Sequence, residues 1–236
     1  MSSWHLGRMC GFDLETTGID MDQDRIVTAC VVQCGGKQPT QSANWLANPG
    51  IDIPKQAEDV HGISTEKARA EGKPAAEVVA DLLGALGQVI AAGIPIVAMN
   101  ARFDLTILDR EAARYGLEPL PTGFPVIDPY VIDKATDKYR AGKRRLTDLC
   151  THYQVPIGEA HTADADAIAA CRVVWRQGSQ TPRLAAMSLA ELHTAQVGWA
   201  AEQAADLQKH LRKADPAAYC PPEWPLLPRH QNGAVL

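Results

Sequence analysis

Two acidic residues stand one residue apart at the end of an apolar run near the N-terminus, in the segment GFDLETTGID (residues 11–20). Alternate residues of a β-strand point to the same face, so Asp13 and Glu15 share a face if the strand continues through them. Carboxylates held close together repel each other and raise each other's pKa unless a cation lies between them. Mg²⁺ and Mn²⁺ suit all-oxygen sites of this kind. Alone, the pair is better explained as an acidic, solvated strand end.

Three further residues shift the balance toward a metal site. Asp104 follows an apolar segment and stands where a helix should begin, although an aspartate there could simply interact favourably with the helix N-terminus. His161 and Asp166 are five residues apart in the sequence. On one helix this spacing would place them about 140° apart around the axis. Both reach one site only if His161 lies in the preceding loop, where Thr162 could serve as the helix N-cap.

Together these acids balance the charge of two divalent cations. Four carboxylates carry a formal charge of −4: Asp13, Glu15, Asp104 and Asp166. That charge suits a two-metal phosphoryl-transfer site, with ions about 3.5–4 Å apart. One ion would lower the pKa of a water and the other would stabilise a leaving 3′ oxygen. His161 would be the general base for the attacking water, a role worth about 10²–10⁴-fold in rate.

The hydrophobic pattern predicts the elements that must position these residues. Strands are expected at residues 8–15, 25–34 and 38–49, joined by short connections as an antiparallel meander. Helices at residues 75–92, 104–116, 146–155 and 162–177 then alternate with short apolar strands at 95–99 and 124–130. This order predicts an α/β fold in which a mixed sheet carries helices on its faces.

The character of the chain changes after Gly178. A long helix is expected over residues 187–214, with Ser188 and Glu191 at capping-box spacing, followed by the proline-rich segment PPEWPLLP. We therefore divide the chain into a main domain, residues 1–178, and a C-terminal helix and proline-rich tail, residues 179–236. This extension is expected to lie on the main domain or to meet a partner.

Composition restricts the function classes. The 236 residues suffice for one large domain with an appendage, and the formal net charge is −5. Proteins that coat a duplex are usually basic, so nucleic-acid binding here must rest on a local site. The six cysteines form no CxxC pair, which favours reduced thiols over disulfides, zinc or redox motifs. Neither a membrane-spanning run nor a secretory signal is visible, so a cytoplasmic protein is expected.

Three segments together resemble the exonuclease motifs of the DEDDh, or DnaQ-like, 3′→5′ exonucleases. This family has the ribonuclease H-like fold and includes the proofreading subunit of bacterial DNA polymerase III. FDLETTG resembles the first motif, NARFD the second, and HTADAD, with its His-x4-Asp spacing, the third. The segments VHGIS, VIDPY and LTDLCTHYQV also match, so the resemblance covers residues 7–177. Met99 departs from it, because a histidine often precedes the asparagine of the second motif.

The resemblance implies hydrolysis of phosphodiester bonds at a 3′ end, with release of nucleoside monophosphates. It implies two Mg²⁺ ions, for which Mn²⁺ could substitute. The implied catalytic residues are Asp13, Glu15, Asp104, His161 and Asp166, of which the four acids are the metal ligands. The implied substrate contacts are Thr16, Thr17, His61 and Asn100, the two threonines through their backbone.

The substrate class and the partner stay open. Single-stranded DNA is the expected substrate, as for an enzyme of DNA replication or repair, and a polymerase or repair partner could bind the C-terminal extension. The alternative is an exoribonuclease that trims RNA ends or short oligoribonucleotides, since nothing in the motifs reads the 2′-hydroxyl. The sequence does not fix the oligomeric state.

Two other function classes explain less. A phosphatase that forms an aspartyl-phosphate on DLETT would leave His161 and Asp166 unused. A passive nucleic-acid binding module would not need the complete catalytic set. The basic run DKYRAGKRRL (residues 137–146) is either a solvated loop or a phosphate-contacting patch.

Overall fold

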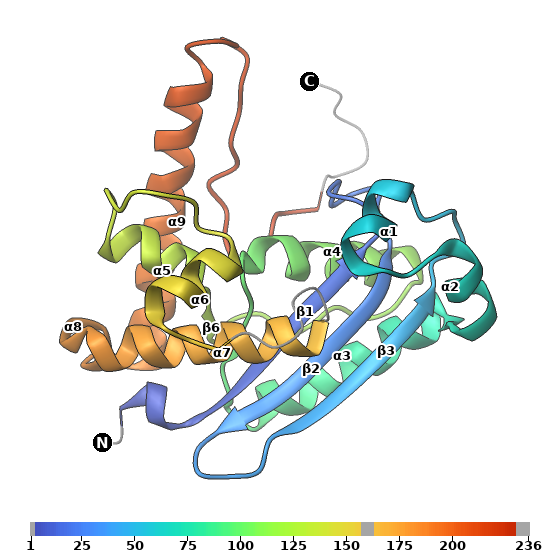
Figure 1. Cartoon of the computed structure of the whole chain (residues 1–236), viewed down its shortest axis with the longest axis horizontal. Helices are drawn as coiled ribbons and strands as arrows, with labels where there is room; N and C mark the ends of the chain where they lie inside the picture. Colours follow the sequence, from blue (N-terminus) through green and yellow to red (C-terminus); the bar gives the residue numbers. More distant parts are fainter. Residues whose placement is uncertain (1–2, 157–162, 230–236) are drawn as a thin grey trace.

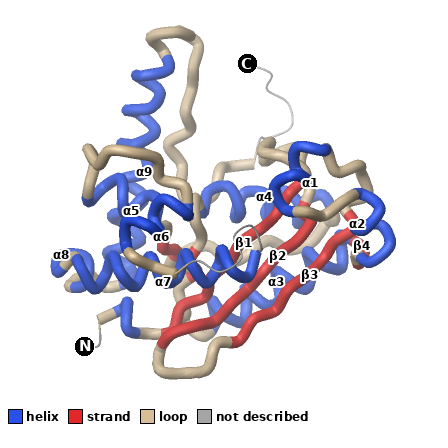
Figure 2. The backbone as a smooth tube through the Cα atoms, in the orientation of Figure 1, coloured by secondary structure: helices blue, strands red, loops and turns tan. Residues whose placement is uncertain are grey.

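A mixed sheet forms the centre of the molecule in the computed structural model, which describes residues 3–156 and 163–229 (Figures 1 and 2). In these residues the sheet has six strands in the order β4-β3-β2-β1-β5-β6. The strands are β1 (Arg8–Thr16), β2 (Ile26–Gly35), β3 (Gln41–Asn48), β4 (Lys73–Pro74), β5 (Ile96–Val97) and β6 (Val126–Ile127). The predicted α/β architecture with a mixed sheet is confirmed.

The long strands β1, β2 and β3 pair antiparallel, as the meander prediction required. Strand β5 then lies parallel to β1, and β6 lies parallel to β5. Along β1, Phe12 and Leu14 are buried on one face of the sheet. Asp13 and Glu15 alternate with them and therefore share the opposite face. The register places Cys30 opposite Asp13 and Thr28 opposite Glu15.

Helices cover both faces of the sheet. The helices α3 and α4 lie behind it in Figure 1, and α7 crosses its front over β1 and β2. The described helices are the 3₁₀ helix η1 (Trp4–Leu6), α1 (Lys55–His61), α2 (Thr65–Glu71), α3 (Ala75–Ala91), α4 (Ala101–Arg114), α5 (Pro129–Thr136), α6 (Leu146–Tyr153), α7 (Ala163–Gln180), α8 (Pro182–Ala185) and α9 (Leu189–Leu211). In that part of the chain, no helix has both the length and the apolar character of a membrane span.

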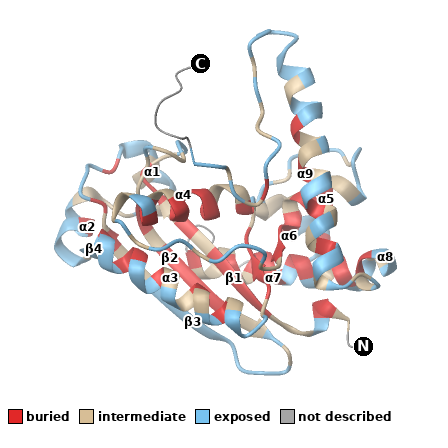
Figure 3. Cartoon of the chain, turned by 180° about the vertical axis from the view of Figure 1, so that it is seen from behind, coloured by how far each residue is buried: buried red, intermediate tan, exposed pale blue. Residues whose placement is uncertain are grey.

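Two apolar layers hold the helices to the sheet, and Figure 3 shows the buried residues along the strands and the inward helix faces. Behind the sheet, Phe12 packs with residues such as Leu82 of α3 and Leu105 of α4. On the β5–β6 side, Val97 packs with Val174 of α7 and Leu192 of α9. Burying each such side chain contributes about 1.5–3 kcal/mol, so these layers fix the relative positions of β1, α4 and α7.

The helices around the second motif differ from the sequence prediction. Helix α4 begins at Ala101, before the expected start at 104, because the Asp128 carboxylate accepts hydrogen bonds from the N–H groups of Asn100 and Ala101. The strand expected at 124–130 was too long. It ends at Ile127 because Asp128 caps α5 and Pro129 occupies the first turn of that helix. The helices α1, α2 and α5 were not predicted.

The C-terminal extension packs on the main domain. Helix α9 begins with the predicted capping box of Ser188 and Glu191. The buried Gln196 of α9 donates to the Val126 carbonyl and accepts from the Asp128 N–H, so it binds the β6 edge. The chain then returns past α4, where the Leu227 N–H donates to the Thr106 hydroxyl. Whether residues 179–236 form a separate functional unit stays a prediction.

All six cysteines are free thiols, and four of them are buried, as expected for reduced cysteines: Cys10, Cys30, Cys150 and Cys171.

Candidate active site

Three of the predicted acids converge at one point of the sheet. Asp13, Glu15 and Asp166 each bring one carboxylate oxygen to within 4.8 Å of the others. The first two come from β1, and Asp166 comes from the first turn of α7. All three residues are half-buried. An all-oxygen cluster of this size and charge fits a divalent cation such as Mg²⁺ or Mn²⁺.

A glycine permits this convergence. Gly11 lies on the same face of β1 as Asp13, directly under α7. A Cβ atom at this position would lie 2.6 Å from the carbonyl oxygen of Ala167, the residue after Asp166. Only glycine therefore lets the α7 backbone approach β1 so closely. The close approach brings Asp166 next to the β1 acids.

The fourth acid lies beside the cluster. Asp104 is buried in the first turn of α4, and its Oδ1 accepts a hydrogen bond of 3.0 Å from the N–H of Leu14. Leu14 stands between Asp13 and Glu15, so this bond ties α4 to the strand that carries both acids. The structure thus brings Asp104 next to the other three, although it is not part of the group whose oxygens lie within 4.8 Å. Its role as a metal ligand stays a prediction.

Crowding makes the carboxylates difficult to ionise. Burial and the charges of Asp104, Glu15 and Asp166 raise the pKa of Asp13 well above its ordinary value. Burial and the charge of Asp166 raise the pKa of Glu15 to about 7. Burial also raises the pKa of Asp104, against the hydrogen bond from Leu14. A bound divalent cation would reverse this penalty, because it favours the charged carboxylates.

A hollow of about 380 Å³ adjoins the carboxylates on the side of β2, β3, α1 and α2. Its lining includes Glu15, Thr28, Asn44, His61, Ile63 and Asp164. Thr28 and Asn44 were missed by the sequence analysis, although strand register could have found them. Thr28 pairs with Glu15, and Asn44 pairs with the partner of Asp13. Asp164, a further acid of the third motif, is half-buried and also lines this hollow.

His61 presents a hydrogen-bond donor at this hollow. It is the last residue of α1, and its Nδ1 accepts a hydrogen bond of 3.1 Å from the N–H of Ile63. Because Nδ1 is an acceptor, the proton of the neutral ring lies on Nε2. Nε2 is buried and forms no close hydrogen bond with another described residue, although the backbone of Thr16 lies near enough to raise the pKa of the ring. Burial lowers the pKa of His61, so the neutral ring is favoured at physiological pH.

The hydroxyls of the two threonines serve the turn after β1. Thr16 Oγ1 donates to the Gly18 carbonyl at 2.6 Å. Thr17 Oγ1 donates to Asp24 at 2.7 Å and accepts from the Arg25 N–H. Both side chains are buried. Any contact of these threonines with substrate must therefore use their backbone, as the resemblance implied, and that contact stays a prediction.

The remaining predicted residues lie elsewhere. Asn100 precedes α4 with a left-handed backbone (φ 61°), and its exposed side chain lines a different hollow together with Arg102 and Tyr130. Asn100 is one helical turn from Asp104. The general-base candidate His161 and the cap candidate Thr162 lie outside the described residues.

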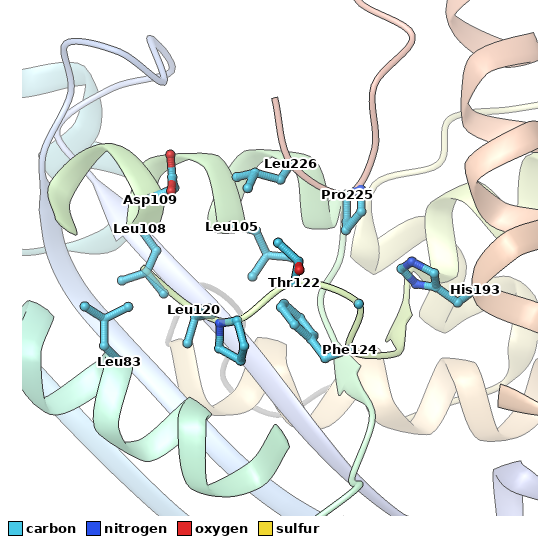
Figure 4. A pocket seen from close by; sticks show the side chains of 12 residues that line it. Leu83, Leu105, Leu108, Asp109, Leu120, Thr122, Phe124, His193, Pro225 and Leu226 are labelled. Carbon is cyan, nitrogen blue, oxygen red and sulfur yellow. The ribbon is translucent and has the colours of Figure 1, made fainter. Parts of the chain in front are cut away.

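A separate apolar cavity of about 170 Å³ lies between α3, α4 and the C-terminal segment (Figure 4). Leucines and a phenylalanine form most of its wall: Leu83, Leu105, Leu108, Leu120, Phe124 and Leu226. Of its polar residues, Asp109 pairs with Arg110 and Arg229, and the His193 Nδ1 accepts from the Val126 N–H. The carboxylate cluster found among the described residues lies at Asp13, Glu15 and Asp166, and not in this cavity.

Most of the basic run has structural partners. Arg140 and Arg144 both pair with the buried Asp133, at 2.8 and 2.7 Å. Two further pairs are Lys138 with Asp206 and Arg145 with Asp148. Of the five cations in the run, only Lys143 forms no ion pair with another described residue. The run as a whole is therefore not a free phosphate-binding patch.

A family model with the description "Exonuclease", RNase_T, matches residues 10–174. Over 166 residues the chain is 27% identical to a PolC-type DNA polymerase III of Oceanobacillus iheyensis, covering 70% of this chain and 11% of that protein. It is 32% identical to a DNA polymerase III subunit epsilon-like protein of Rhodobacter capsulatus, covering 70% and 23%. It is 28% identical to the DNA polymerase III subunit epsilon of Treponema pallidum, covering 66% and 69%. The chain thus spans less than a quarter of the first two relatives.

Solved structures of exonuclease I share the fold. One is matched with a TM-score of 0.65 at 20% identity, over 76% of this chain and 42% of that chain. Another, E. coli exonuclease I in complex with a dA16 oligonucleotide, is matched with a TM-score of 0.63 at 19% identity, over 76% and 42%. At this identity the likeness shows the ribonuclease H-like fold.

Proposed function

Because the chain belongs to the RNase_T exonuclease family, whose members hydrolyse nucleic-acid ends on a DnaQ-like fold, we propose that it is a metal-dependent 3′→5′ exonuclease that acts on single-stranded DNA. The products would be nucleoside monophosphates. The observation that carries this proposal is the convergence of Asp13, Glu15 and Asp166, with Asp104 hydrogen-bonded to the strand between the first two.

We propose Mg²⁺ as the cofactor, with Mn²⁺ as a substitute, held by the four acids Asp13, Glu15, Asp104 and Asp166. Two bound ions would supply a water of lowered pKa and charge stabilisation at the leaving 3′ oxygen. The fit rests on the donor set, which consists of carboxylates alone. It is supported by the burial and the charge of Asp166 that raise the pKa of Glu15, because a bound cation would offset this penalty on the charged carboxylate.

The other predicted residues take the following roles in this proposal. His161 accepts the proton of the attacking water. His61 donates from Nε2 to the terminal nucleotide, a role supported by its place in the lining of the hollow beside Glu15 and by the lack of a close hydrogen bond from Nε2 to another described residue. The backbone of Thr16 and Thr17 lies along the terminal sugar, while Asn100 contacts the phosphate or the nucleotide from the start of α4.

Two findings support DNA as the substrate. The curated relatives are named as parts of DNA polymerase III. The structural neighbours include E. coli exonuclease I with dA16 and with dT13 oligonucleotides, both single-stranded DNA. We extend these properties to this chain as a proposal, and with them a role in proofreading or repair.

We also propose that residues 179–236 bind a polymerase or repair partner in addition to covering the domain of residues 1–178. The far end of α9 projects away from the sheet in Figure 1. There Leu207 and Leu211 are 49% and 42% exposed, so two leucines of this helix remain available to a partner.

The test compares oligonucleotides that differ in one feature at a time. A 5′-labelled single-stranded DNA with a free 3′ end should shorten stepwise with Mg²⁺ or Mn²⁺ and remain intact with chelator. The same DNA with a 3′-phosphorothioate end block should resist. An RNA of the same sequence should react more slowly. Degradation from the 5′ end, or faster degradation of the RNA, would contradict the proposed polarity or substrate.

A further inference from the structure

A groove begins at the first turn of α4 and continues along α5. Its first part, about 160 Å³, is lined by Asn100, Arg102, Tyr130 and Lys134 among others. Its second part, about 380 Å³, is lined by Tyr130, Lys134 and residues 142–145. Because Tyr130 and Lys134 line both parts, the two hollows adjoin each other. We call them together the α4–α5 groove.

The α4–α5 groove starts next to the carboxylates. Asn100, at its near end, is four residues before Asp104, which corresponds to about 6 Å along the helix axis. Asp104 is hydrogen-bonded to the strand between Asp13 and Glu15. A polynucleotide whose 3′ end lies at these acids therefore has the groove within reach of its next nucleotides.

Arg102 is a half-buried cation without a partner. Its Nε is buried and forms no hydrogen bond, and no ion pair joins its guanidinium to another described residue. Asp128 and Glu223 act on it only through their charges. By contrast, the half-buried Arg114 pairs with Glu111. An unsatisfied buried donor is unfavourable, and a phosphate oxygen would satisfy it through a charge-assisted hydrogen bond.

Two lysines extend the positive charge along the groove. Lys134 is half-buried, with its Nζ 3.3 Å from the Tyr130 hydroxyl and 5.0 Å from the centre of that ring. Lys143 is exposed on the loop before α6. Neither forms an ion pair within the described residues. The aspartate in the groove, Asp128, is buried and accepts N–H groups at the starts of α4 and α5.

We propose that the α4–α5 groove binds the phosphates of the nucleotides upstream of the 3′-terminal one, through Arg102, Lys134 and Lys143. This inference rests on the proposed function and deepens it, because it makes a polynucleotide the preferred substrate over a single nucleotide ester. The groove also gives a chain of net charge −5 a local cationic path for an anionic strand. Each phosphate neutralised on a single strand should add about 0.7 to the salt dependence of binding.

The experiment compares a long and a short substrate. Variants are Arg102→Gln, Lys134→Gln, Lys143→Gln and the triple variant. The matched control is Lys37→Gln, which removes an exposed lysine in the turn after β2, at the end of β1 away from the acids. Values of kcat/KM are measured with Mg²⁺ on a dT20 oligonucleotide and on the p-nitrophenyl ester of thymidine 5′-monophosphate, which is too short to reach the groove.

We expect each groove variant to raise KM for dT20 by about three- to tenfold, the range between an exposed and a half-buried charge contact. The ratio of kcat/KM between dT20 and the ester should fall with each variant. In the triple variant, the slope of log KM for dT20 against log salt should fall by about 2. The Lys37→Gln control should keep both the ratio and the slope.

The outcomes separate the two proposals. An unchanged ratio and slope in all groove variants of an active enzyme would overturn the groove and leave the exonuclease proposal intact. A wild type inactive on both substrates would instead refute the exonuclease proposal. The groove is then tested by fluorescence anisotropy of labelled dT20 in chelator, where weaker binding by the triple variant supports it and unchanged binding overturns it.

Discussion

Replacing Glu15 by glutamine should stabilise the metal-free protein while destroying its site. In the folded state the pKa of Glu15 rises from its ordinary 4.5 to about 7, through burial and the charge of Asp166. The unfolded chain therefore loses this proton at lower pH than the folded chain, and stability falls as the pH rises from 4.5 to 7. At about 1.4 kcal/mol per pH unit, the full loss is about 3 kcal/mol. Glutamine mimics the neutral acid, so the variant does not lose this stability as the pH rises.

The assay is urea unfolding of both proteins in chelator between pH 5 and pH 8. Glu15→Gln should be more stable than wild type by up to about 3 kcal/mol at pH 8, and by about 1 kcal/mol or less at pH 5. The exposed Glu202→Gln is the matched control and should show no such trend. Adding Mn²⁺ at pH 8 should stabilise wild type more than Glu15→Gln, because the folded state alone binds the ion.

The result that refutes this reasoning is a Glu15→Gln protein as stable as wild type, or less stable, at pH 8 in chelator. A stability difference that does not change between pH 5 and pH 8 would refute it equally. Either result would mean that the carboxylates are not held together in the folded chain against their repulsion.

Three other substitutions test the positioning of the site. Gly11→Ala should destabilise the protein by about 1–3 kcal/mol and slow turnover by about 10²-fold, because the new Cβ atom displaces α7 and Asp166. Thermal unfolding measures the loss of stability and steady-state kinetics measures kcat. An unaffected kcat would contradict this prediction. Asp128→Asn should cost about 2–5 kcal/mol in urea unfolding, because an amide has one accepting oxygen and cannot accept at both positions, from the Asn100 N–H at one and the Ala101 N–H at the other; a cost below 1 kcal/mol would contradict it. His161→Ala should lower kcat by about 10²–10⁴-fold and leave Mn²⁺ affinity in calorimetry unchanged; full activity would exclude this histidine as the base.

The sequence predicted the sheet and the acids because both depend on local signals. Alternating apolar residues define β1 to β3, and short connections leave antiparallel pairing as the simple solution. Within β1, period-two alternation places Asp13 and Glu15 on one face whatever the rest of the chain does. The motif spacing then located Asp104 and Asp166 on the helices that meet this strand.

What the sequence did not predict depends on contacts between distant residues. The start of α4 and the existence of α5 both depend on Asp128. Its carboxylate accepts a hydrogen bond from the N–H of Asn100, 28 residues upstream, and another from the N–H of Tyr130 in the first turn of α5. The basic run is largely structural because Asp133, a buried acid, pairs with Arg140 and Arg144. No periodicity shows that this acid faces inward. Similarly, Arg102 is distinguished only by the absence of a partner in the folded chain.

The most direct test of the central claim, that these acids hold a pair of catalytic cations, is anomalous X-ray diffraction from crystals of the protein with Mn²⁺ and thymidine monophosphate. The account predicts two manganese peaks about 3.5–4 Å apart, both in contact with Asp13, with Glu15, Asp104 and Asp166 among their ligands. Manganese bound away from Asp13, or no peak at these carboxylates at saturating Mn²⁺, would contradict it.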